Sequence, residues 1–222
     1  MKKANSATSL AGLKWGDHLA CLCDTAEERL EVLGSYIHEG LQRGQRVCCL
    51  LDKGNPEAVM DALSRLHEEP ETCLTTGRLS FVRIDEFLGL GTFEPDSMFE
   101  WLELQERQAL DNGCSGLRVT LEMSWVLRGL VRTADLLAFE LKLTSFVEKR
   151  KCLILCQYER KRFTPASLLF VVTVHPRILH AKQVYDNCYF LAAPHLLEKD
   201  LPATTLGRWL KDLRSRQMTV PA

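Results

Sequence analysis

Two hydrophobic periodicities alternate along the chain, one typical of buried strands and the other of amphipathic helices. Short runs that are apolar throughout, such as residues 19–23 and 46–51, predict strands that are covered on both faces of a sheet. In residues 26–41, which lie between these runs, apolar side chains recur every three or four positions, and this spacing predicts a helix. Thr25, with Glu28 three residues later, has the spacing of a capping box at the start of that helix.

The same alternation continues towards the end of the chain. Further strands are predicted at residues 79–84, 117–123, 152–156 and 177–184, and further helices at 56–66, 95–111, 133–149, 165–174 and 206–214. Strands that alternate with helices favour an α/β fold, in which a mostly parallel sheet carries helices on both faces. We expect the last strand to be antiparallel or at the sheet edge, and a mobile loop at residues 86–96.

Composition and charge narrow the class of protein. The 222 residues carry a formal net charge of −1, and 46% of them are hydrophobic, as is typical of a globular domain. This balance does not favour nucleic acid or an anionic membrane as a partner. The sequence shows no apolar run long enough to cross a bilayer and no signal peptide, so we expect a cytoplasmic location. The nine cysteines, several of them within apolar runs, are predicted to be reduced and buried.

Polar residues follow most of the predicted strands. In open parallel sheets, ligands bind outside the carboxyl ends of the strands. The residues at these positions are Asp24, Asp52, Asp85, Glu122 and Gln157. Each one alone is equally well explained as a solvated turn or capping residue. Their convergence on one edge of the sheet nevertheless predicts a ligand site there.

Three further residues are candidates for a binding site. Trp125 follows Glu122 closely, and together they could place a carboxylate beside an aromatic wall that binds an amine, water or a cation. His18 begins the first strand, where it could contact a ligand or be hydrogen-bonded within the core. His175 follows the predicted helix 165–174, where the helix dipole would favour a partly positive imidazole. For both histidines, the structural role is the more common one.

Four cysteines are candidate metal ligands or thiol switches. Cys21 and Cys23 are two residues apart on one strand and therefore face the same side. Cys48 and Cys156 lie on strands that could be neighbours. No C-x2-C pair is present, however, and a free cysteine also packs as a small apolar residue. We therefore favour buried thiols without a metal, and leave the cofactor unassigned.

The sequence lacks the motifs that mark several large enzyme classes. It contains no phosphate loop of the form G-x-x-x-x-G-K-[ST], no G-x-G-x-x-G after the first strand, and no G-x-S-x-G nucleophile motif. It also shows no helix-turn-helix segment, and its short basic clusters are typical of solvated surfaces. We therefore expect neither an enzyme nor a protein that binds nucleic acid directly.

Several short motifs resemble those of the MEDS domain, the sensory domain named for methanogens, methylotrophs and the regulator DcmR. The segments that carry the resemblance are, in order, Gly16-Asp17-His18-Leu19-Ala20-Cys21, Gly44-Gln45-Arg46-Val47 after the helix, Leu121-Glu122-Met123-Ser124-Trp125, Cys156-Gln157-Tyr158-Glu159 with Arg162-Phe163, His175-Pro176, and Val184-Tyr185-Asp186-Asn187. Each motif is short, but their order and spacing together are fairly specific. The resemblance covers residues 14–192, and residues 193–222 are expected to form a C-terminal helical extension.

The resemblance implies a RecA-like or KaiC-like core without the phosphate loop, and a non-catalytic sensor of a small molecule in bacterial or archaeal signalling or transcription control. With Asp24 from the strand ends, the expected ligand-binding residues are His18, Asp24, Glu122, Trp125, Gln157, Tyr158 and His175. The given sequence shows no DNA-binding module, so we expect the signal to pass through a regulatory partner protein or a homodimer. Two alternatives stay open: a degenerate nucleotide-binding, ATPase-like domain, and a switch that responds to thiol chemistry or metal.

Overall fold

The computed structural model describes residues 8–88 and 93–191, and in these residues strands and helices alternate as the sequence predicts. The strands are β1 (His18–Cys23), β2 (Arg46–Leu51), β3 (Leu79–Arg83), β4 (Leu117–Glu122), β5 (Cys152–Glu159), β6 (Arg177–His180) and β7 (Gln183–Asp186). The helices are α1 (Ala26–Gln42), α2 (Pro56–Ser64), α3 (Pro70–Thr75), α4 (Pro95–Asp111), α5 (Thr133–Val147) and α6 (Pro165–Val174).

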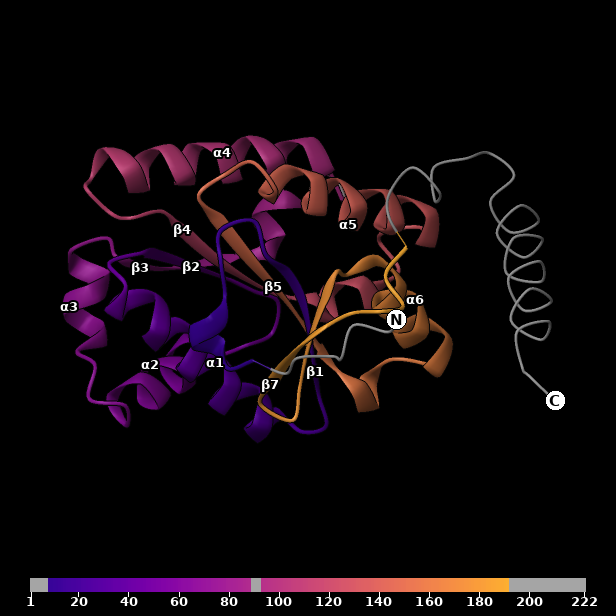
Figure 1. Cartoon of the computed structure of the whole chain (residues 1–222), viewed down its shortest axis with the longest axis horizontal. Helices are drawn as coiled ribbons and strands as arrows, with labels where there is room; N and C mark the ends of the chain where they lie inside the picture. The colour runs from indigo at the N-terminus through magenta and orange to yellow at the C-terminus, as the bar shows by residue number, and fades with distance from the viewer. Residues whose placement is uncertain (1–7, 89–92, 192–222) are drawn as a thin grey trace, which may run out of the picture. The chain divides into compact units, whose positions relative to one another are not determined.

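The seven strands form one sheet in the order β3-β2-β4-β5-β1-β6-β7. All neighbouring strands are parallel except β6 and β7, which are antiparallel. Figure 1 shows α4 and α5 on one face of the sheet and α1 and α2 on the other. The predicted α/β fold, a mostly parallel sheet with helices on both faces, is therefore confirmed.

Local signals in the sequence explain where several helices begin. The hydroxyl of Thr25 accepts a hydrogen bond from the backbone N–H of Glu28, as the predicted capping pattern requires. Thr164 caps α6 in the same way, through the backbone N–H of Ser167. Pro56 occupies the first turn of α2, where a missing N–H costs nothing because that group has no partner within the helix.

The end of the described chain differs from its prediction. Residues 177–184 were expected to form one strand, but β6 and β7 form a hairpin. The two turn residues, Ala181 and Lys182, have positive φ angles of 49° and 61°. Such turns usually contain glycine or asparagine, and neither stands here to signal the reversal. The short helix α3 was also missed. The predicted helix 206–214, the predicted extension 193–222 and part of the predicted mobile loop 86–96 lie outside the described residues.

Each face of the sheet has its own hydrophobic core, because successive side chains of a strand point to opposite faces. On one face, side chains such as Ala20, Ile154 and Cys156 pack beneath α4, α5 and α6. On the other, side chains such as Cys21, Cys49 and Leu155 pack against α1 and α2 or the N-terminal segment. In the described part of the chain, no helix combines the length and apolar character needed to cross a membrane.

Candidate functional site

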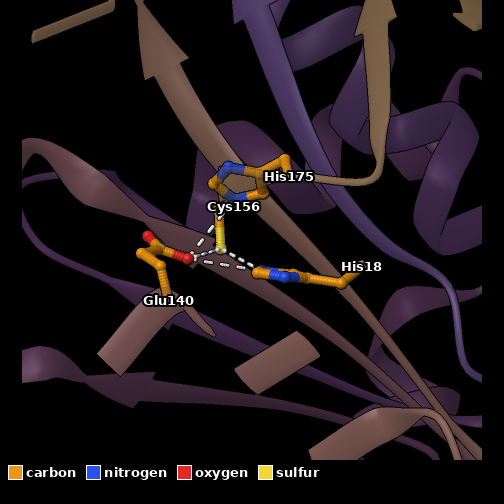
Figure 2. Close-up of side chains that lie close together, drawn as sticks. All are labelled: His18, Glu140, Cys156 and His175. Atoms are coloured by element: carbon orange, nitrogen blue, oxygen red, sulfur yellow. Dashed lines mark hydrogen bonds and ion pairs between the residues drawn. The ribbon is translucent and has the colours of Figure 1, made fainter. Parts of the chain in front are cut away.

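Four polar side chains meet inside the core between the sheet and helices α5 and α6 (Figure 2). They are His18 at the start of β1, Glu140 in α5, Cys156 in β5 and His175 directly after α6, and we call them the central cluster. In the register of the parallel pair, Cys156 lies opposite Ala20, so His18 and Cys156 point to the same face of the sheet. All four side chains are fully buried. Residues far apart in the sequence therefore form one polar centre.

The carboxylate oxygen Oε2 of Glu140 lies at the middle of the central cluster. It is 3.3 Å from Nε2 of His18 and 3.3 Å from Nε2 of His175. The thiol sulfur of Cys156 is 3.8 Å from this oxygen and 3.4 Å from Nε2 of His18. The four candidate ligand atoms all lie within 4.8 Å of one another. No other group of three or more His, Cys, Asp or Glu side chains in the described chain comes together in this way.

Surrounding groups hold the outward-facing atoms of the central cluster. Nδ1 of His18 contacts the hydroxyl of Thr144 at 2.8 Å, and that hydroxyl donates to the carbonyl of Glu140. Nδ1 of His175 donates to the carbonyl of Val171 at 2.8 Å. The hydroxyl of Tyr158 donates to Oε1 of Glu140 at 2.6 Å. Each Nδ1 is therefore an N–H donor, and the Nε2 atoms and Oε2 are left to face the centre.

Burial changes the acid–base behaviour of these side chains. Desolvation, followed by the nearby charge of His175, lowers the pKa of His18 to about 4. Desolvation alone would raise the pKa of Glu140, but the imidazoles of His175 and His18, each 3.3 Å from its carboxylate, lower it well below the usual range. Desolvation and the charge of Glu140 raise the pKa of the Cys156 thiol. At neutral pH, the central cluster thus contains a neutral His18, an ionised Glu140 and a protonated Cys156.

The contacts inside the central cluster leave part of its bonding capacity unused. Nε2 of His175 makes no hydrogen bond within the described residues, although it is fully buried and 3.3 Å from Oε2 of Glu140. Nε2 of His18 lies equally close to Oε2, a contact that is an ion pair only when the imidazole is protonated, and it lies 3.4 Å from the thiol of Cys156. With Nδ1 protonated, a neutral His18 presents a lone pair at Nε2, and two acceptors this close repel each other. A cation at the centre would remove this repulsion, so these residues could hold a metal ion.

At the carboxyl ends of the strands, where the sequence predicts a ligand site, the polar side chains are paired with other protein groups. Oε2 of Glu122 accepts hydrogen bonds from the backbone N–H groups of Asp52 and Gly54, at 2.9 and 2.8 Å. Its other oxygen lies 3.9 Å from the guanidinium of Arg29. The buried carboxylate of Asp52 pairs with Arg128. The polar groups of this edge therefore bind one another.

The other predicted residues of this edge are also engaged by protein groups. Gln157 accepts a hydrogen bond from Arg29 at 3.3 Å and donates one to Thr120. Asp24 is exposed, pairs with Arg160 at 2.7 Å, and lines an open groove of about 540 Å³ beside α6. The ring of Trp125 is completely buried and packs on Phe93, with their centroids 4.5 Å apart. Of the seven predicted ligand residues, the structure brings together His18, Tyr158 and His175.

The cysteine predictions had mixed outcomes. Cys21 and Cys23 do face the same side, with their sulfur atoms 3.1 Å apart, but on the face of the sheet opposite to the central cluster. The predicted proximity of Cys48 and Cys156 is wrong, because β4 lies between their strands. Sequence reasoning also missed Glu140. A signal was present, because Glu140 falls between Leu136 and Leu143 in the apolar stripe of the predicted helix.

Comparison with known families decides which family this chain belongs to. The family model described as "MEthanogen/methylotroph, DcmR Sensory domain" matches residues 17–176. The chain belongs to the MEDS family. The resemblance inferred from the short motifs is therefore confirmed, and the matched range contains all four residues of the central cluster. A search among curated proteins finds no match to this MEDS domain.

Solved structures resemble this MEDS domain in fold. They include the flagellar accessory protein FlaH from Methanocaldococcus jannaschii, at 13% sequence identity, and a KaiC-like protein from Pyrococcus horikoshii OT3, at 12%. Each has a TM-score of 0.53, over 76% of this chain and 72% of its own length. At this identity the similarity shows the fold alone, and it confirms the predicted RecA-like or KaiC-like core.

Proposed function

We propose that this MEDS domain is a non-catalytic sensor in bacterial or archaeal signalling or transcription control, and that the central cluster is its input site. One observation carries the proposal: four buried polar side chains from β1, α5, β5 and the end of α6 converge with unused bonding capacity. Buried polar groups are normally satisfied, and an unsatisfied one calls for an explanation. A bound ligand supplies that explanation.

The burial of the central cluster suits a sensor. All four side chains have no exposed surface, so a ligand can enter only when the packing around them opens. Binding is then linked to a conformational equilibrium of the domain, since the ligand favours whichever state binds it better. The elements that must move are α5 and α6, which cover the central cluster. Such a link between occupancy and conformation is the basic property of a sensor.

Helix α6 offers a route from the central cluster to the surface. It ends at His175, and the side chain of Asn187, just after β7, donates a hydrogen bond to the carbonyl of His175 at 2.7 Å. On its outer side, Leu169 is 69% exposed. A shift of His175 would therefore move both a surface helix and the segment after the β6–β7 hairpin. We propose that a regulatory partner protein, or a second copy of the chain, reads this movement.

A ligand screen with two matched variants tests the location of the input site. Metabolites and metal ions are added separately to the full chain, and the melting temperature is measured. We expect Glu140→Gln to abolish the stabilisation by any hit, and Glu122→Gln to retain it. Both residues are buried glutamates, so each controls for loss of charge in the other. The opposite pattern would move the input site to the carboxyl ends of the strands.

The alternative of a degenerate nucleotide-binding domain is supported by the KaiC-like fold. Local geometry counts against it. Only Asp24 and Thr25 connect β1 to α1, whereas a phosphate loop between a strand and a helix needs about eight residues. Equilibrium dialysis with labelled ATP separates the two functions. Retention of ATP at micromolar concentration would favour the nucleotide-binding function over the sensor that we propose.

A further inference from the structure

We propose that the central cluster binds one divalent transition-metal ion of the zinc type, in a four-coordinate site made by His18, Glu140, Cys156 and His175. This inference rests on the proposed function and deepens it, because it names the ligand of the same site. The four donor atoms are Nε2 of each histidine, Oε2 of Glu140 and Sγ of Cys156.

Four of the six separations between these atoms are close to the edges of a coordination tetrahedron. Zinc bonds are about 2.0–2.1 Å to nitrogen, 2.0–2.2 Å to oxygen and 2.3 Å to sulfur, which gives tetrahedral edges of roughly 3.3–3.7 Å. The observed edges are 3.3 Å from Glu140 to each histidine, 3.4 Å from His18 to Cys156, and 3.8 Å from Cys156 to Glu140. The other two separations, from the His175 nitrogen to the His18 nitrogen and to the Cys156 sulfur, are at most 4.8 Å, so an ion at the centre would draw His175 towards these two side chains.

The size of the central cluster favours a single ion over a small organic molecule. The four donor atoms lie within 4.8 Å of one another, so a point between them is about one metal–ligand bond length from each. A molecule with several heavy atoms would have to push α5 or α6 away from the sheet. A proton on Nε2 of His175 would also balance the charge of Glu140, but this nitrogen makes no hydrogen bond to Oε2 although the two atoms are 3.3 Å apart.

The groups around the donor atoms are those that orient metal ligands. A metal-binding histidine typically donates its other N–H to a carbonyl, carboxylate or water. Nδ1 of His175 donates to the carbonyl of Val171, and Nδ1 of His18 to the hydroxyl of Thr144. The hydroxyl of Tyr158 holds Oε1 of Glu140 and leaves Oε2 for the ion. These outer contacts thus orient three of the four donor atoms, Nε2 of both histidines and Oε2 of Glu140, towards the centre of the central cluster.

Charge balance favours a divalent ion. When the ion binds, the Cys156 thiol loses its proton to solvent and the thiolate forms the metal–sulfur bond. One carboxylate and one thiolate then neutralise the two positive charges of the ion, and both histidines bind as neutral imidazoles. A neutral site avoids the large cost of a net charge in the interior. Two imidazoles and a thiolate select zinc, cobalt or iron(II) over magnesium or calcium, which prefer oxygen ligands.

Metal analysis of the full chain tests this inference. The protein is stripped with a chelator, loaded with Zn²⁺ or Co²⁺, and passed through a desalting column before elemental analysis. We expect about one ion per chain, and a cobalt absorption spectrum that shows tetrahedral geometry and a sulfur-to-metal charge-transfer band. Cys156→Ala should remove the charge-transfer band and weaken binding at least tenfold. Cys48→Ala should do neither, because this equally buried thiol lies outside the central cluster.

Folding controls keep the result interpretable. Circular dichroism of each metal-free variant checks that it folds, and His175→Gln gives a second, independent removal of a ligand. Folded wild-type protein that retains neither Zn²⁺ nor Co²⁺ would overturn the inference. Retention that is unchanged in both Cys156→Ala and His175→Gln would overturn it as well, because the ion would then be bound elsewhere. Stabilisation by an organic molecule that depends on Glu140, without any metal, would preserve the proposed function and reject only the metal.

Discussion

Glu140 is the residue whose replacement tests the central cluster most directly. Glu140→Gln keeps the size of the side chain and removes its negative charge. In the metal-free protein, the carboxylate accepts a hydrogen bond from Tyr158 at 2.6 Å and lies 3.3 Å from both imidazoles. Removing one partner of a buried charged pair costs about 3–5 kcal/mol. We expect the free energy of unfolding to fall by that amount, because the glutamine can replace the Tyr158 contact but not the charge.

Urea denaturation followed by circular dichroism, at pH 7 and with a chelator present, measures this change. For a domain of this size, a loss of about 3–5 kcal/mol corresponds to a melting temperature lower by roughly 6–20 °C. Glu103→Gln is the matched control, since Glu103 forms a half-exposed ion pair with Arg150 that contributes at most about 1 kcal/mol. A loss below about 1 kcal/mol for Glu140→Gln would refute the reasoning, because Glu140 would then be uncharged in the folded protein.

Three further predictions concern the core. Folding lowers the pKa of His18 from 6.5 to about 4, so between these pH values the unfolded chain binds more protons than the folded one. The free energy of unfolding of the metal-free protein should therefore fall by about 3 kcal/mol as the pH falls through this range. Urea denaturation at a series of pH values should show a weaker pH dependence for His18→Asn. Tyr158→Phe should cost about 1.5–3 kcal/mol in the same assay, less than Glu140→Gln, because one hydrogen bond to a charged group is lost. Gly40→Ala should lower the melting temperature, although alanine favours helices more than glycine does. The new Cβ at position 40 would lie 2.6 Å from Cδ of the buried Arg118, which is too close. An unchanged or higher melting temperature would show that Arg118 can move aside.

Much of the fold could be predicted from local sequence patterns. The bounds of β2, α4 and α6 agree with their predictions, because apolar spacing and end signals such as Pro95 and Pro165 point to the same limits. The β6–β7 hairpin could not be predicted, because its turn residues, Ala181 and Lys182, have no intrinsic preference for positive φ. Helix α3 was missed because six residues are too few to show a helical period.

The candidate site was only partly predictable, and His18 and Glu140 show why. The sequence predicts a ligand site at the carboxyl ends of the strands, in which Glu122 lies together with His18, Tyr158 and His175. The structure places the three inside the core, on the face covered by α5 and α6. Glu140 carried the signal of a charge within an apolar stripe, yet such a charge can also reach solvent at the edge of a helix. Its burial depends on which elements cover α5.

The sequence by itself determined the alternation of strands and helices, the missing phosphate loop and the motifs of the MEDS family, because each of these depends on residues close together in the chain. Only the tertiary structure decided that β5 lies beside β1 and that α5 and α6 cover them. Hydrophobic periodicity indicates which face of a helix or strand is buried, but it does not indicate which other helix or strand packs against that face. The meeting of His18, Glu140, Cys156 and His175 depends on those neighbours, so it appears only in the folded chain.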